Sequence, residues 1–211
     1  MNEILDFLFS QYKDYSTLNI CLEAIASVFG ALSVVYSARN SILVYPTGIV
    51  STVIFTYMFL QWDLYGDVII SFYYFIMSIY GWMLWSRKDK QDDKLLEINQ
   101  MTAKDVAKCI QIFIVSVIFV AIVFIYNNKF TYWWAYVDTF TTGLCFVGMW
   151  LLAKRKIENW IFLIIADIIA IPLLFYKGAT VTSIFYIFLT IVAFIGYFSW
   201  KRTLQNQIQA S

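Results

Sequence analysis

Long apolar runs constrain this chain more than any other feature of its sequence. A helix needs about 20 mainly apolar residues to cross the roughly 30 Å hydrocarbon core of a bilayer. Runs of about that length lie near residues 17–36, 42–61, 65–86, 108–127, 132–153, 158–176 and 180–200. The sequence therefore predicts an all-α polytopic membrane protein with seven transmembrane helices.

Composition agrees with this fold class. The chain is 61% hydrophobic, 20% aromatic and only 14% charged, whereas soluble proteins carry about 25% charged residues. The longest polar interval, about residues 87–108, is too short to bury a core of its own, so a single membrane domain is expected. A net charge of +1 argues against a nucleic-acid partner, because phosphate binding needs a concentrated basic surface.

The metal-binding and redox residues are few and scattered. The chain has no histidine, and its three cysteines, Cys21, Cys109 and Cys145, show no metal or redox spacing. We interpret these cysteines as small packing residues. The sequence also lacks a nucleotide-binding loop and a nucleophile elbow. We therefore expect neither a cofactor nor a metal, and neither enzymatic activity nor transport driven by ATP.

The first sixteen residues predict an amphipathic segment at the membrane surface rather than a removable signal peptide. Acidic residues interrupt this stretch, whereas a signal peptide has a basic start and a continuous apolar block. Its apolar residues share one side of a short helix, as expected for an interfacial segment. They are Ile4, Leu5, Leu8 and Phe9.

The distribution of basic residues predicts the orientation. With seven crossings the termini lie on opposite sides, and cytoplasmic loops are enriched in lysine and arginine. The amino-terminal side has only Lys13, Lys129 and Lys177. The other side has Arg39, Arg87, Lys88, Lys90, Lys94, Lys104, Lys108, Lys154, Arg155, Lys156, Lys201 and Arg202. The amino terminus is thus expected outside and the carboxyl terminus in the cytoplasm.

A weak internal repeat indicates how the helices are organised. Gly81, Trp85 and Arg87 recur 115 residues later as Gly196, Trp200 and Arg202. Four crossings separate the two copies, so both have the same orientation, and parallel repeats of this kind build transporters with a site near the membrane midplane. The predicted parts are an amphipathic segment 1–16, a first three-helix repeat 17–86, a loop and connector helix 87–131, a second three-helix repeat 132–200 and a tail 201–211.

Asp167 is the first candidate for a functional group. It lies near the middle of the apolar segment 158–178, where an ionised carboxylate costs roughly 2.5 to 3.5 kcal/mol. Trp160 precedes it by seven residues and projects from the same helical face. That face can offer a ring and a negative charge to one ligand. The alternative is that Trp160 anchors the helix at the interface and Asp167 serves a polar group on a neighbouring helix.

Other acidic and aromatic residues favour a cationic ligand. No predicted span has a lysine or arginine in its middle, so a buried carboxylate needs a cationic substrate, a coupling ion or a proton. Asp138 shares one side of its span with Thr141, Thr142 and Cys145. Ser71 and Tyr74 lie among aromatic residues in segment 65–86, and aromatic faces attract cations. Such an aromatic stripe is, however, more often core packing or an interfacial belt. Asp67 is also explained as a helix cap, and Glu23 as an interfacial residue.

Three phrases together resemble the PnuC-type vitamin transporters. They are AKRKIENW at 153–160, VDTFTTGLCFVGMWLL at 137–152 and SIYGWMLW at 78–85. The resemblance covers essentially the whole chain and implies a 3+1+3 helix plan related to the SWEET architecture. It also implies facilitated diffusion of a vitamin across the bacterial inner membrane, trapping by a cytoplasmic vitamin kinase, and a homotrimer with one pathway in each protomer.

The chain departs from the family's nicotinamide riboside motif. That motif has Trp, two residues, Trp, three residues and Asn. Trp160 matches the first tryptophan, but Leu163 and Asp167 replace the other two residues. Thiamine carriers of the family resemble this variant, so thiamine is the expected substrate and nicotinamide riboside the alternative. An ion-coupled secondary transporter and a membrane-embedded interaction subunit are two further alternatives.

The expected substrate-binding residues follow from the pattern and the resemblance together. Trp160 is expected to stack against a ring of the vitamin, and Asp167 to supply the negative charge. The hydrogen-bonding candidates are Asp138, Asn159, Asn40, Ser71 and Tyr74.

Overall fold

Seven long helices make up most of the described structure. The computed structural model describes residues 16–61, 65–87, 96–127, 130, 132–177 and 180–210. Its helices are α2 (Thr17–Ala38), α3 (Val44–Gln61), α4 (Tyr65–Ser86), α5 (Ala103–Tyr126), α6 (Trp133–Ala153), α7 (Asn159–Tyr176) and α8 (Thr180–Ala210). All seven are long and apolar enough to cross a bilayer. The predicted all-α class with seven spans is confirmed.

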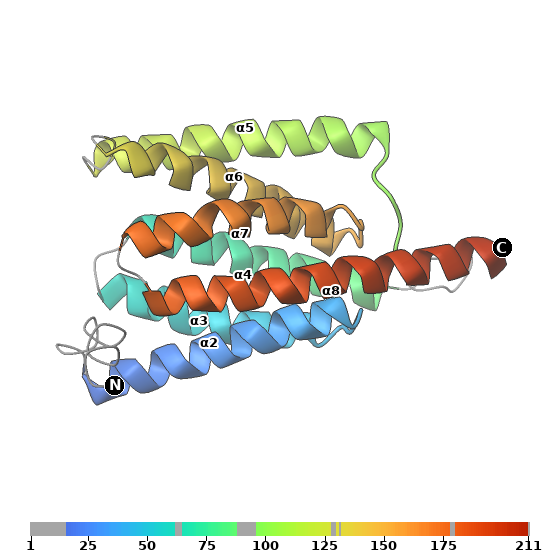
Figure 1. The fold of residues 1–211 in the computed structure, drawn as a ribbon, viewed down its shortest axis with the longest axis horizontal. Helices are drawn as coiled ribbons and strands as arrows, with labels where there is room; N and C mark the ends of the chain where they lie inside the picture. Colours follow the sequence, from blue (N-terminus) through green and yellow to red (C-terminus); the bar gives the residue numbers. More distant parts are fainter. Residues whose placement is uncertain are drawn as a thin grey trace.

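The helices form two three-helix units, and α5 is the connector between them. Within the first unit, α2 packs on α3 and α3 on α4; within the second, α6 packs on α7 and α7 on α8. The units meet through α2 with α8 and through α4 with α6, while α5 lies at the edge against α6 (Figure 1). Each unit thus contributes its first and third helices to the shared boundary, which is the predicted 3+1+3 plan.

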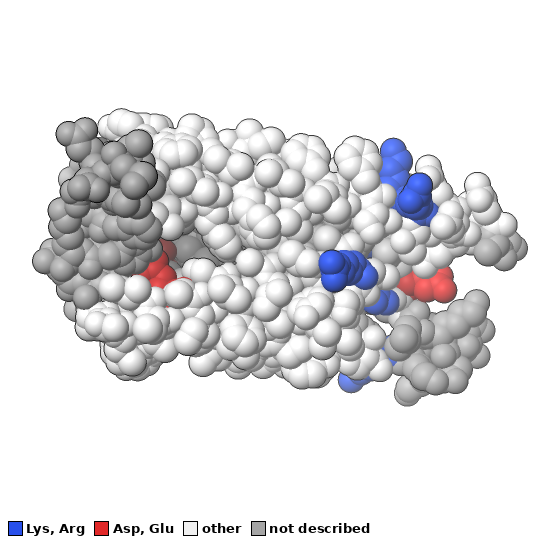
Figure 2. All heavy atoms as spheres, turned by 60° about the horizontal axis from the view of Figure 1, so that its bottom comes forward, with Lys and Arg blue, Asp and Glu red and all other residues white. Residues whose placement is uncertain are grey.

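The surface of this bundle suits a membrane. Large apolar side chains are exposed along the helices, for example Val115, Ile118, Ile122 and Ile125 on α5. On the face in Figure 2, the described lysine and arginine side chains lie toward the end where α8 extends, and the other half carries none. Apolar surface of this extent is stable only against lipid or a partner chain.

The helix ends differ from the predicted limits by more than two residues in two places. The predicted span 108–127 begins earlier, at Ala103, because Thr102 and Asp105 form a capping box that continues the helix outside the apolar run. The helix α8 continues past Trp200 to Ala210, since residues that leave the hydrocarbon can remain helical in water. Of the predicted amphipathic segment 1–16, only Ser16 is described, and its side chain caps α2 by accepting a hydrogen bond from the Asn19 N–H.

The turns that end α2 and α6 have the same backbone geometry. Asn40 and Arg155 are the only described non-glycine residues with positive φ, at 54° and 51°. They lie 115 residues apart, the offset of the predicted repeat. Left-handed backbone is costly for an arginine, so its recurrence at matching positions supports a genuine structural repeat.

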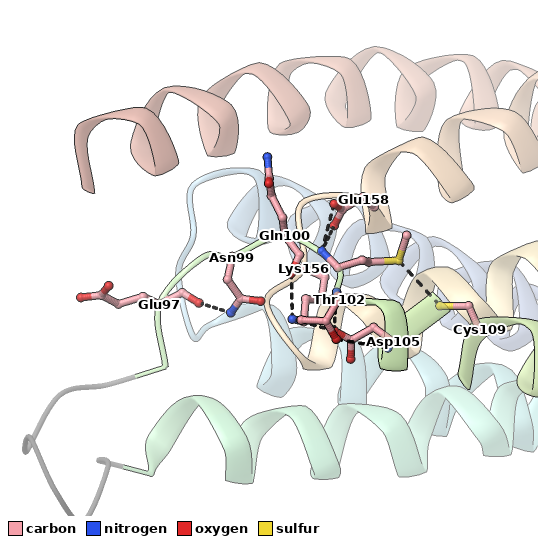
Figure 3. A network of polar contacts seen from close by, with 9 residues as sticks. Glu97, Asn99, Gln100, Thr102, Asp105, Cys109, Lys156 and Glu158 are labelled. Carbon is pink, nitrogen blue, oxygen red and sulfur yellow. Dashed lines mark hydrogen bonds and ion pairs between the residues drawn. The ribbon is translucent and has the colours of Figure 1, made fainter. Parts of the chain in front are cut away.

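The segment before α5 is fastened to the turn between α6 and α7 (Figure 3). The Glu158 carboxylate accepts hydrogen bonds from the Met101 N–H at 3.0 and 3.1 Å. Lys156 Nζ lies 2.9 Å from the Asp105 carboxylate and donates to the Gln100 carbonyl. The connector is therefore tied to the second unit at the end where most of the described basic residues lie.

Candidate functional site

Asp167 lies inside the bundle rather than facing lipid. It projects from α7, and its side chain is only 8% exposed. Thr190 on α8 lies beside its carboxyl group, and the Thr190 hydroxyl donates to the Tyr186 carbonyl at 2.8 Å. Among the described residues, no lysine or arginine forms an ion pair with it. A carboxylate in this position needs a cation or a proton to offset its charge.

Side chains from three other helices surround this carboxyl group. Tyr74 on α4 lies beside Cys145 on α6, and Cys145 in turn lies near Asp167. Tyr186 on α8 interacts electrostatically with both Cys145 and Asp167. We call Tyr74, Cys145, Asp167, Tyr186 and Thr190 the central cluster. It joins one negative group to hydroxyls, a thiol and two rings, which is suitable chemistry for a cation with polar substituents.

An aromatic contact between the two units borders the central cluster. The rings of Tyr73 and Phe146 stack with centroids 3.9 Å apart and planes 9° from parallel. The Tyr73 hydroxyl donates a 2.9 Å hydrogen bond to the Phe146 carbonyl. This contact holds α4 against α6 and helps to fix the neighbouring Tyr74 within the central cluster.

Trp160 lies on the same face of α7 as Asp167 but in different surroundings. Seven residues of helix separate the two by roughly 10 Å along the axis. The Trp160 ring is 1% exposed and meets the Trp200 ring edge-on, with centroids 5.6 Å apart. A ligand that touches both residues must therefore extend along α7 or move from one to the other.

The remaining predicted site residues are spread along the bundle. Asn159 is fully buried beside Trp160, and its Nδ2 donates to the Lys156 carbonyl at 2.7 Å. Asn40 occupies the turn after α2. Ser71 is buried on α4, one turn before Tyr74. Only Asp167 and Tyr74 belong to the central cluster.

Asp138 lies near the start of α6, toward the end of the bundle away from Asn159, and already has a cationic partner. It forms an ion pair with Lys177, and the Lys177 ammonium lies 4.2 Å from the centre of the Trp134 ring. This pair joins α6 to the end of α7. The negative charge of Asp138 is therefore offset within the protein, unlike that of Asp167.

Sequence reasoning missed Tyr186 and Thr190 as members of the central cluster. Tyr186 lies 115 residues after Ser71, so the repeat offset pairs a missed residue with a predicted one. Cys145, interpreted from the sequence as a packing residue, also belongs to the cluster. The sequence could have indicated this role, because Cys145 shares the polar side of its span with Thr141 and Thr142.

Two parallel three-helix units that meet around a polar cluster define a class of membrane transport protein. The chain matches the family described as nicotinamide mononucleotide transporter over residues 20–202, and it belongs to that family. The predicted PnuC-type family is thereby confirmed. The chain is a multi-pass membrane transporter and not an enzyme.

Curated relatives and a solved structure agree with this family. The nicotinamide riboside transporters PnuC of Escherichia coli and Shigella flexneri are each 24% identical to the chain. Each alignment covers 88% of this chain and 87% of the relative. The crystal structure of the vitamin B3 transporter PnuC is similar in fold, with a TM-score of 0.67 and 19% identity. That alignment covers 96% of this chain and 90% of the other.

Proposed function

We propose that this transporter carries a cationic B-type vitamin by facilitated diffusion, with nicotinamide riboside as the lead substrate. The observation that carries the proposal is the buried Asp167 carboxyl, which no described lysine or arginine neutralises. The pyridinium ring of the riboside supplies a positive charge, and its ribose hydroxyls suit Tyr74, Tyr186 and Thr190. The names of the similar proteins reverse the order expected from the sequence, which put thiamine first.

Thiamine is the second candidate, because one feature of the chain favours it. Leu163 and Asp167 stand where the riboside motif has tryptophan and asparagine. In the structure, Leu163 packs closely on Gly148, where an added Cβ would lie 2.8 Å from Leu163 Cδ2. A tryptophan-sized ring is thus replaced by a smaller side chain that packs within the second unit, while the carboxylate at 167 remains for a thiazolium cation.

A binding panel separates the two vitamins. Purified protein in detergent is titrated with nicotinamide riboside, thiamine and riboflavin by calorimetry. We expect micromolar or tighter binding of the riboside and little binding of uncharged riboflavin. Tighter binding of thiamine than of the riboside would reverse the substrate order. Absence of binding by both cations would overturn the proposed function.

Transport itself is tested in vesicles. Protein reconstituted into liposomes without any ion gradient is expected to equilibrate the vitamin and not concentrate it. Enclosing ATP and a vitamin kinase should convert equilibration into accumulation, because phosphorylation removes the free vitamin inside. Uptake that requires a proton or sodium gradient would instead identify an ion-coupled transporter.

Orientation and assembly complete the proposal. We propose that the chain lies in the bacterial inner membrane with the amino terminus outside and the carboxyl terminus in the cytoplasm. The position of the basic side chains in Figure 2 supports that orientation through the positive-inside tendency. A homotrimer follows from the family resemblance, and crosslinking in native membranes tests it.

A further inference from the structure

Four aromatic rings fill the boundary between the two units at the end where α2 and α6 finish. Tyr45 meets Trp85 edge-on at 5.1 Å and 89°, and Trp160 meets Trp200 at 5.6 Å and 88°. The ring centroids of Trp85 and Trp200 lie 6.0 Å apart, so this contact joins the two pairs. We call these residues the four-ring cluster. All four side chains are at most 2% exposed, so no open path crosses the cluster.

The four-ring cluster follows the internal repeat. Tyr45 and Trp160 lie 115 residues apart, as do Trp85 and Trp200. Tyr45 and Trp160 each lie against a glycine of the adjacent helix. A Cβ added at Gly81 would lie 2.3 Å from Tyr45 Cε1, and one at Gly196 would lie 2.6 Å from Trp160 Cζ2. The same arrangement is therefore built once by each unit.

Two hydrogen bonds cross between the units at the four-ring cluster. Trp85 on α4 donates through Nε1 to the Ala153 carbonyl at the end of α6, at 3.2 Å. Trp200 on α8 donates through Nε1 to the Ser37 carbonyl near the end of α2, at 2.9 Å. Each unit thus holds the other by a tryptophan on its third helix. By contrast, the Asp138 and Lys177 ion pair toward the opposite end lies within the second unit.

Two polar atoms in the cluster are left without partners. Tyr45 Oη and Trp160 Nε1 are buried and make no hydrogen bond within the described part of the chain. An unsatisfied buried polar group costs about 1 to 3 kcal/mol. Opening the cluster would allow water or a passing ligand to satisfy both groups. The closed arrangement is therefore held by the crossed bonds and opposed by these two unpaired groups.

We infer that the four-ring cluster is a gate at this end of the transport path, locked by the crossed Trp85 and Trp200 hydrogen bonds. This inference rests on the proposed transport function. Trp160 lies on the face of α7 that carries Asp167, so a ligand released from the central cluster toward this end meets the four-ring cluster next. Both crossed bonds must break for the ligand to leave.

Cys145 provides a reporter for this gate, since it belongs to the central cluster and lies about two turns of α6 before Ala153, which accepts the Trp85 hydrogen bond. In a Cys21→Ser, Cys109→Ala background, a cationic, membrane-impermeant methanethiosulfonate reagent is added to the face of membrane vesicles that carries the α8 end. Trp85→Phe and Trp200→Phe each keep a ring but lose the donor. In each variant the reagent is expected to label Cys145 roughly two- to tenfold faster than in the background protein. This range corresponds to the loss of one hydrogen bond of about 0.5 to 1.5 kcal/mol.

The matched control is Trp150→Phe, which removes an indole from α6 outside the four-ring cluster and should leave the labelling rate unchanged. Gly81→Ala keeps all four rings but displaces Tyr45, so it should also accelerate the labelling of Cys145. It replaces a tryptophan variant that fails to fold. No acceleration in any of the gate variants, or equal acceleration by Trp150→Phe, would overturn the inference. The assay contains no vitamin, so its result is separate from the binding panel and from any failure of the proposed function.

Discussion

A carboxyl group in the middle of a membrane helix requires a compensating partner. Asp167 has hydroxyl, thiol and aromatic neighbours, and no described cationic residue forms an ion pair with it. Asp138 provides the contrast within the same chain, because Lys177 already neutralises it. The difference between these two aspartates is the physical reason for assigning cation binding to Asp167.

Removal of the negative charge at Asp167 should weaken vitamin binding. Asp167→Asn keeps the side-chain shape but loses a charge-assisted contact of about 1.5 to 3 kcal/mol, so the Kd should rise about tenfold or more. Glu97→Gln is the matched control, because Glu97 is an exposed acid in the segment before α5. Calorimetric titration measures both variants. Equal Kd values for Asp167→Asn and the unmodified protein would remove Asp167 from the binding site.

At the scale of elements, the connector is held at two places. The capped start of α5 is tied to the turn between α6 and α7, where Arg155 adds a cation 3.9 Å from the centre of the Trp85 ring. Burial lowers the pKa of Arg155, although its guanidinium remains charged at neutral pH. Further along, α5 packs on α6 through Phe113, whose ring lies against Gly143. The connector therefore belongs mechanically to the second unit.

Loss of the Glu158 carboxylate should release the segment before α5. Glu158→Ala removes the acceptor of the Met101 N–H, and a hydrogen bond to a charged group contributes about 1.5 to 3 kcal/mol. Amide hydrogen exchange at Met101 is expected to accelerate by roughly tenfold or more. Glu97→Ala, which removes an exposed carboxylate from the same segment, serves as the control. Unchanged protection of Met101 in Glu158→Ala contradicts this role.

A methyl group added at Gly143 should loosen the contact between α5 and α6. The new Cβ would lie 2.9 Å from the Phe113 ring, whereas at Gly30 it would meet the Ser51 side chain, with Oγ nearest at 3.1 Å. Gly143→Ala is expected to destabilise the protein by about 1 to 3 kcal/mol, and Gly30→Ala by less. Thermal unfolding in detergent ranks the two variants. A lower midpoint for Gly30→Ala than for Gly143→Ala would contradict the packing argument.

At the scale of the whole molecule, the span number, the 3+1+3 plan and the family could be predicted from the sequence. Apolar run lengths and a repeat offset are properties of the chain itself, and Gly81 with Trp85 marked the repeat. The members of the central cluster could not all be found, because Tyr186 and Thr190 reach Asp167 only through the rotation and packing of α8. The crossed bonds of Trp85 and Trp200 also depend on how the two units meet.

In the proposed function, Asp167 recognises the positive charge of the vitamin. Nicotinamide riboside and its reduced form have nearly the same shape, but only the oxidised form is a cation. Their Kd values, measured on the unmodified protein and on Asp167→Asn, test the claim directly. We expect at least tenfold tighter binding of the oxidised form, because a charged contact contributes about 1.5 kcal/mol or more, and loss of that preference in Asp167→Asn. Equal affinities for both forms, or a preference that survives in Asp167→Asn, would contradict it.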